Sequence, residues 1–227
     1  GCSYHHNFSL NVLAYSLGIN CSLLTTSKFA ATLMTNTTNP FLMNRSSRCR
    51  ISITGTPGCG KSSLANYAVN LPSYELIEVS ELAEMHGFIE QIDDNDGARP
   101  IDIDGLAQML EEQWKTPPTH DTFIDGHLSH FLPVDAIVIL RCNPEVLSQR
   151  NKTRGWSKEK IKENEEWELL GGTWNDYDEW KGLPCLELNS TAHSTDALFE
   201  GIEQWIRDGF KPEAPEEEID WVSVLHG

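Results

Sequence analysis

The segment Gly55–Ser62 constrains the fold of this chain more than any other, because it reads G-T-P-G-C-G-K-S between a strand pattern and a helix pattern. Residues 50–54 are rich in β-branched side chains and predict a short strand. Residues 61–70 carry apolar side chains at helical spacing. Glycines let successive backbone N–H groups turn inward, and a helix N-terminus adds partial positive charge. The segment therefore predicts a loop that cradles phosphate oxygens.

Two side chains at the end of this loop extend the prediction to a nucleoside triphosphate with magnesium. Lys61 can reach the β- and γ-phosphates, and Ser62 offers a hydroxyl to Mg²⁺. Cys59 inside the loop has two interpretations. It is either a small filler or a redox-sensitive thiol, since helix N-termini lower the pKa of thiols.

Phosphoryl transfer with magnesium also needs a carboxylate at the end of a neighbouring strand. Asp125 closes the strand pattern of residues 122–125 and is the candidate. Its nearby His127 either orients a water or senses the γ-phosphate, or it is structural. His130 is a weaker candidate of the same kind.

Arginines should converge on the negative charge that spreads over the transition state. For each candidate arginine, the alternative to a role at the transition state is a salt bridge on the surface. The candidates are Arg99, Arg141, Arg150 and Arg154. Arg154 precedes Gly155 and a charged helix, as a hinged lid would require. Two interpretations are open for three tryptophans, which either stack on a base or pack against helices: Trp156, Trp167 and Trp174.

Strand and helix patterns alternate from residue 50 onward. Strands are expected at 50–54, 76–79, 122–125, 136–141 and 186–188. Helices are expected at 61–70, 80–86, 104–114, 144–152, 157–170 and 195–206, with Ser80 capping the second and the fifth mostly exposed. Continuous apolar strands such as 136–141 suit a parallel sheet covered on both faces. The chain is thus expected to be an α/β P-loop protein with a doubly wound, five-stranded parallel sheet.

Charge divides the chain sharply near residue 50. The 227 residues have a formal net charge of −17, yet residues 1–50 contain no Asp or Glu. Residues 51–227 hold all 34 acidic residues against 13 basic ones, a net charge of −21. This charge argues against a broad nucleic-acid surface and favours a basic protein partner. It suits either a salty cytoplasm or an ordinary acidic protein.

The two ends of the chain are expected to lie outside the working domain. Residues 1–49 form an extra segment, either a transit peptide or a stretch that is disordered or foreign to the native protein, with translation then starting at Met43. Residues 211–227 form an acidic tail, loose around 212–218. No apolar run reaches the roughly 18 residues that span a bilayer. The six cysteines lack metal-like spacing and fit a reducing cytoplasm.

Several longer stretches resemble one protein family. They are residues 53–62, 125–133, 138–147, 153–161, 163–164 and 202–206. Across about 50–207 the chain resembles the archaeal family named "putative adenylate kinase" and its eukaryotic relative, adenylate kinase isoenzyme 6, an ATPase of small-subunit ribosome assembly. The chain departs from the family pattern at Glu165, at residues 171–174 and in the acidic tail.

The resemblance implies an adenylate-kinase-like core with a short nucleotide-monophosphate region at 78–102 and a short lid at 153–163. It implies ATP contacts at Gly58, Gly60, Lys61, Ser62, Ser63 and Arg154. Asp125 and His127 match the family's Asp-x-His motif, which is linked to hydrolysis. AMP is the implied acceptor, and slow ATP hydrolysis is the implied second activity. The resemblance also implies a role in maturing the small ribosomal subunit through one of its ribosomal proteins.

Three hypotheses follow for the function. The first is an ATP:AMP phosphotransferase with intrinsic ATPase activity, whose ADP production is lost in Lys61→Ala. The second is a ribosome-assembly switch that hydrolyses ATP on a protein partner and responds little to AMP. The third is a P-loop kinase for another small acceptor, which residues 78–102 would hold.

Overall fold

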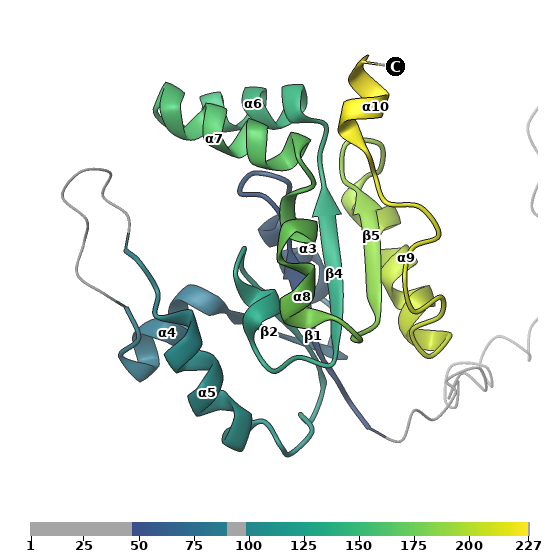
Figure 1. Ribbon diagram of the computed structural model, residues 1–227. Helices are drawn as coiled ribbons and strands as arrows, with labels where there is room; N and C mark the ends of the chain where they lie inside the picture. The colour runs from purple at the N-terminus through teal and green to yellow at the C-terminus, as the bar shows by residue number, and fades with distance from the viewer. Residues whose placement is uncertain (1–46, 90–98, 227) are drawn as a thin grey trace, which may run out of the picture. The chain divides into compact units, whose positions relative to one another are not determined.

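A five-stranded parallel sheet forms the centre of the domain in the computed structural model, which describes residues 47–89 and 99–226 (Figure 1). The strands are β1 (Arg50–Thr54), β2 (Tyr74–Glu78), β3 (Asp121–Asp125), β4 (Ala136–Arg141) and β5 (Cys185–Asn189). Their order is β2-β3-β1-β4-β5, and every pairing is parallel. The α/β architecture expected from the sequence is confirmed. The prediction for residues 1–49 concerns a segment of which 1–46 lie outside the described residues.

The apolar strand patterns are explained by burial on both faces of the sheet. All residues of β3 and β4 are buried, as are the last four residues of β1. Strand β2 begins at Tyr74, two residues earlier than expected, and its ring stacks on Phe123 at 5.3 Å between centroids. It ends at Glu78 because Val79 already belongs to the next helix and packs into the core.

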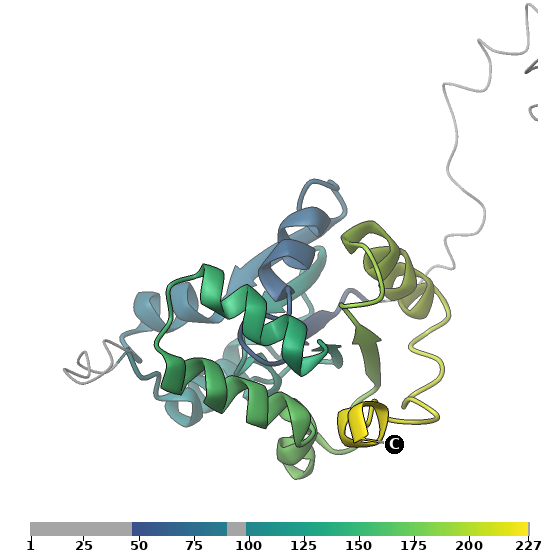
Figure 2. The same ribbon diagram turned by 90° about the horizontal axis from the view of Figure 1, so that it is seen from above.

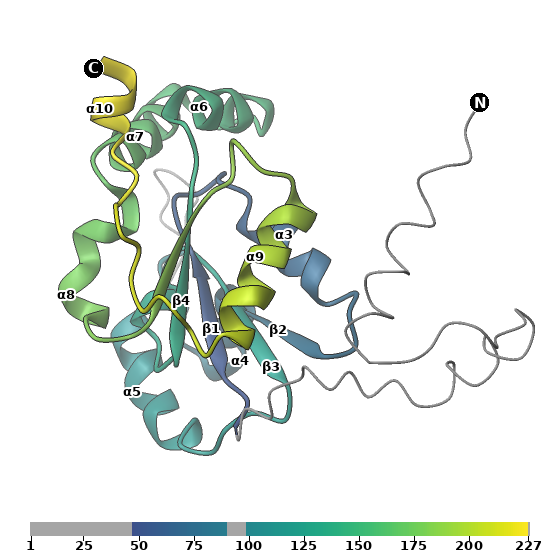
Figure 3. The same ribbon diagram turned by 90° about the vertical axis from the view of Figure 1, so that its right-hand side faces the viewer.

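Helices cover the two faces of the sheet in separate layers, as Figure 3 shows for α3 and α9 on one face and α5 and α8 on the other. The first layer consists of α3 (Lys61–Ala68) and α9 (Thr195–Arg207), which pack in one apolar cluster. The second consists of α4 (Val79–His86), α5 (Ile103–Gln113) and α8 (Tyr177–Trp180). Glu78, not Ser80, holds the N-cap position of α4. None of the helices in 47–89 and 99–226 is long and apolar enough to cross a membrane.

Two helices lie across the carboxyl ends of the strands, α6 (Pro144–Thr153) and α7 (Lys158–Leu169) (Figures 1 and 2). Asn143 caps α6 by accepting from the backbone N–H of Glu145 at 2.9 Å, and Pro144 occupies the first turn, where its missing N–H costs nothing. Ser157 caps α7. The loop between the helices therefore holds Arg154 above the strand ends.

The C-terminal stretch is not loose, contrary to expectation. Trp205 Nε1 donates to the Pro212 carbonyl at 2.9 Å, and Cys185 N donates to the Glu213 carbonyl at 2.8 Å. The chain then forms α10 (Trp221–His226), whose Trp221 is 3% exposed. Apolar anchors and backbone hydrogen bonds thus outweigh the solvation of the acidic residues between them.

Helix α7 is also less exposed than its charged sequence predicts. Ile161 and Glu168 are buried on the side that faces the domain. The short 3₁₀ segment η2 (Gly172–Asp176) and α8 follow α7, in a stretch where the sequence pattern predicts no helix. Their aromatic residues Trp174 and Trp180 pack against each other, with ring centroids 5.2 Å apart. This packing closes the second layer next to β5.

Candidate active site

The phosphate loop connects β1 to α3 at the carboxyl end of the central strand. Gly55, Gly58 and Gly60 have φ angles of 134°, 101° and 108°, a region that L side chains rarely adopt. A Cβ at Gly58 would lie 2.2 Å from Asn151 Oδ1, because α6 packs closely against the loop. These glycines therefore serve both the backbone conformation and the close approach of a neighbouring helix.

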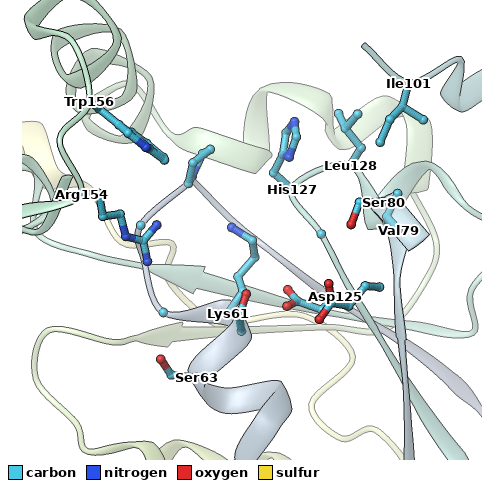
Figure 4. Close-up of a pocket in the computed structure, with 16 residues that line it drawn as sticks. Lys61, Ser63, Val79, Ser80, Ile101, Asp125, His127, Leu128, Arg154 and Trp156 are labelled. Atoms are coloured by element: carbon cyan, nitrogen blue, oxygen red, sulfur yellow. The ribbon is translucent and has the colours of Figure 1, made fainter. Parts of the chain in front are cut away.

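Lys61 starts α3 and reaches back over the loop. Its Nζ donates to the carbonyl oxygens of Gly55 at 2.8 Å and Thr56 at 3.2 Å, and the residue is only 8% exposed. The ammonium group is thus held at the loop, and Figure 4 shows Lys61 and Asp125 directed toward the same space. A phosphate bound by the loop would meet this charge.

Asp125 ends β3, next to β1 on one side and Glu78 of β2 on the other. Its carboxylate hydrogen-bonds with Ser62. Burial raises the pKa of Asp125 above its ordinary value, and the Ser62 hydrogen bond and the charge of Lys61 act in the opposite direction. The adjoining hydroxyl and carboxylate are oxygen donors of the kind that Mg²⁺ prefers, so these two residues fit the magnesium role predicted for them.

The two histidines after β3 lie in different environments. His127 lines the cavity and is exposed at its surface. Protein around the imidazole desolvates it and Lys61 lies nearby, so the pKa of His127 is lowered and the ring is neutral at pH 7. His130 is buried, and its ring nitrogens contact Thr54 Oγ1 at 2.8 Å and Asp176 at 3.2 Å. His130 is therefore a structural residue that ties β1 to η2.

A cavity of about 300 Å³ opens above the phosphate loop (Figure 4). The predicted site residues gather around it: Gly58, Gly60, Lys61, Ser62, Ser63, Asp125, His127 and Arg154. Arg154 is exposed, and its guanidinium carbon lies 5.6 Å from the centre of the Trp156 ring. Trp156 also lines the cavity, so of the three tryptophans it is the one at the site.

The other candidate arginines lie outside this cavity. Arg99 pairs with Glu84 at 3.4 Å on the surface. Arg150 contacts the loop from outside, with Nη1 3.5 Å from the Cys59 carbonyl oxygen. Arg141 is 1% exposed and ion-paired within the core. Among the predicted arginines, Arg154 alone lines the cavity.

Cys59 is a filler of the loop. Its side chain is fully buried, and this burial, opposed by the charge of Lys61, raises the pKa of the thiol to about 11. A thiol that stays protonated is a poor target for oxidation. Burial and the raised pKa therefore favour the filler interpretation over the redox one, because desolvation outweighs the effect of the helix N-terminus.

One wall of the cavity consists of residues that the sequence did not single out for the site, on the side away from Arg154 (Figure 4). Glu78, Val79, Ser80, Ile101 and Leu128 form it. Four of them belong to the expected nucleotide-monophosphate region 78–102, of which residues 90–98 lie outside the described part of the chain. The family resemblance indicates the region as a whole but none of these side chains, since apolar and acidic side chains carry no phosphate-binding signal.

The chain is similar to known proteins over the whole site. A family model described as an AAA domain matches residues 51–171. A protein of Archaeoglobus fulgidus named "Putative adenylate kinase" is 38% identical over 181 residues, which cover 77% of this chain and 93% of that protein. Proteins of the same name from Thermococcus onnurineus and Pyrococcus abyssi are 35% and 34% identical and cover 71% and 77% of this chain. These alignments cover 86% and 92% of those two proteins.

Proposed function

Since this chain belongs to the archaeal family named "Putative adenylate kinase" and is a P-loop nucleotide kinase, we propose that it transfers the γ-phosphoryl group of ATP to AMP. The observation that carries the proposal is the convergence of Lys61, Asp125 and Arg154 on one cavity above the phosphate loop. A donor phosphate held by the loop would lie between these charges. The wall formed by residues 78–80, Ile101 and Leu128 leaves space for an acceptor.

The residues divide the work of phosphoryl transfer by position. The loop amides and the Lys61 ammonium would hold the donor phosphates. Ser62 and Asp125 would hold Mg²⁺, which when bound neutralises charge on the phosphate oxygens. Arg154 sits between α6 and α7, where a small movement of the lid would bring its guanidinium onto the transferring group. The guanidinium lies over the ring of Trp156, 5.6 Å from its centre.

The test is a coupled assay of ADP formation from ATP with and without AMP. We expect AMP to raise the rate strongly, and Lys61→Ala to abolish it. Arg154→Ala should lower kcat by about a hundredfold, the usual loss for one donor to the transition state. The controls are Lys115→Ala and Arg99→Ala, which remove exposed cations outside the cavity. An AMP-independent rate, or an equal loss in Arg99→Ala, would contradict the proposal. Strong activity with another acceptor would instead indicate a different small-molecule kinase.

Slow ATP hydrolysis is a second candidate activity, supported by His127. Its imidazole is neutral and lines the cavity two residues after Asp125, so it can accept a hydrogen bond from an attacking water. We expect His127→Ala to lower hydrolysis without AMP more than it lowers transfer to AMP. An equal loss in both reactions would assign His127 to nucleotide binding.

The acidic surface supports a further part of the proposal, a basic protein partner in maturation of the small ribosomal subunit. Residues 51–227 carry a net charge of −21, which attracts a basic protein and repels bare RNA. The corresponding experiment adds a basic ribosomal protein of the small subunit to the ATPase assay. Stimulation that is lost at high salt supports this role, and an unchanged rate at low salt contradicts it.

A further inference from the structure

Glu168 of α7 is a fully buried carboxylate that contacts the phosphate loop at Thr56. Its Oε1 accepts hydrogen bonds from Arg141 Nε at 2.7 Å, Cys142 N at 3.0 Å and Trp221 Nε1 at 2.9 Å. Its Oε2 accepts from the hydroxyl of Thr56, the second residue of the loop. One side chain therefore joins β4, α10 and the loop.

The charged groups around Glu168 are buried, so each of them needs a partner of opposite charge or a hydrogen bond. Arg141 also donates from Nη1 to Glu187 at 2.8 Å, and the three side chains are each 1% exposed or less. Burial acts to lower the pKa of Arg141, but the two carboxylates reverse this effect and raise it, so the guanidinium stays charged. Two carboxylates face one guanidinium, and a buried charge without enough donors is strongly destabilising. The hydroxyl of Thr56 is one of the few donors that complete the shell.

The same hydroxyl connects the network to the nucleotide site. The carbonyl oxygen of Thr56 is one of two that accept a hydrogen bond from Lys61 Nζ, at 3.2 Å. Gly172 shows how closely the parts fit, because a Cβ there would lie 3.1 Å from Glu168 Oε2 and 3.4 Å from Thr56 Oγ1. The missing side chain of Gly172 thus leaves room for this contact.

We propose that Glu168 is a positioning residue of the nucleotide site, which acts through Thr56. By holding the Thr56 side chain it fixes the peptide whose carbonyl receives Lys61, and with it the shape of the loop that faces the phosphates. Trp221 extends the connection to α10, so the C-terminal helix supports the same loop. The inference rests on the proposed function only in that nucleotide phosphates bind at Gly55–Ser62.

The experiment compares three threonine variants by calorimetric titration with Mg-ADP, together with thermal unfolding. Thr56→Val keeps the shape and removes the hydroxyl, and Thr56→Ser restores it. Thr122→Val is the matched control, since Thr122 is also buried and donates a hydrogen bond, to the His120 carbonyl at 3.0 Å, but lies at the amino end of β3. We expect Thr56→Val to raise the Kd about tenfold, the loss of one hydrogen bond to a charged group. For Thr56→Ser and Thr122→Val, the Kd for Mg-ADP should stay within about twofold of the value for the unchanged protein.

A double-mutant cycle then assigns the effect to the contact itself. In a Glu168→Gln background, Thr56→Val should have little additional effect on the Kd, because the charged partner is already gone. The inference would be overturned if the increase in Kd in the double variant equalled the product of the increases in the two single variants. It would also be overturned if Thr56→Val bound Mg-ADP as tightly as Thr122→Val. If Glu168→Gln does not fold, the three threonine variants decide alone. Binding of Mg-ADP needs no acceptor, so a chain that binds it but transfers nothing to AMP refutes the proposed function and leaves this inference standing.

Discussion

Gly58→Ala is expected to damage the protein by steric conflict rather than by backbone strain alone. Gly58 has φ 101° and Gly182 has φ 97°, so alanine brings a similar conformational penalty at both positions, roughly 1–2 kcal/mol. At Gly182 a Cβ meets nothing within 4 Å, whereas at Gly58 it lies 2.2 Å from Asn151 Oδ1. Asn151 is 0% exposed, and its Nδ2 donates to the Pro57 carbonyl at 3.2 Å, so it cannot withdraw freely. Overpacking of this kind costs about 1–3 kcal/mol more.

The assay is urea unfolding of both variants, followed by titration with Mg-ADP. Gly182→Ala should lower the free energy of unfolding by about 1 kcal/mol, because the smaller entropy of its unfolded chain offsets part of the backbone strain. Its affinity for Mg-ADP should not change. Gly58→Ala should lose about 2–4 kcal/mol and bind ADP weakly. Adding Asn151→Ala should recover part of the affinity by making room for the methyl group. Equal losses in the two single variants would refute the reasoning, because the clash would then contribute nothing.

Three further predictions concern titratable groups of the site. The pKa of Asp125 is raised in the folded protein, so the protonated carboxyl stabilises the fold below about pH 3.8, and this contribution is lost as the pH rises through the raised value. At pH 7 the Asp125→Asn variant should therefore unfold at a higher temperature than the unchanged protein, and it should lose activity. The lowered pKa of His127 costs stability as the pH falls below about 6.5, so the difference in free energy of unfolding between His127→Ala and the unchanged protein should shift in favour of the variant between pH 7 and 5. Cys59 should resist iodoacetamide in the folded protein at pH 8 and react after unfolding, as mass spectrometry of the peptide would show.

The phosphate loop and its flanks could be predicted because their signals are local. Glycine spacing, Lys61 and Ser62 follow from the backbone conformation and helix start that phosphate binding requires. Asp125 followed almost as directly, since carboxyl ends of neighbouring parallel strands meet at one edge of a sheet. Arg154 is indicated by the glycine that follows it and by the family resemblance. The roles assigned to these residues stay predictions, while their gathering around one cavity is observed.

The sequence by itself indicated the five strands, the helices α3, α4, α5, α6, α7 and α9, the phosphate loop and the family, because each is signalled by residues close together in the chain. Only the tertiary structure decided which charged residues are buried. Glu168 stands in a run of charged residues typical of an exposed helix, and Arg141 was a candidate for the transition state. They pair at 2.7 Å in the core, because α7 packs over the end of β4. Burial depends on residues far apart in the chain, so no local pattern around Glu168 or Thr56 could show their contact.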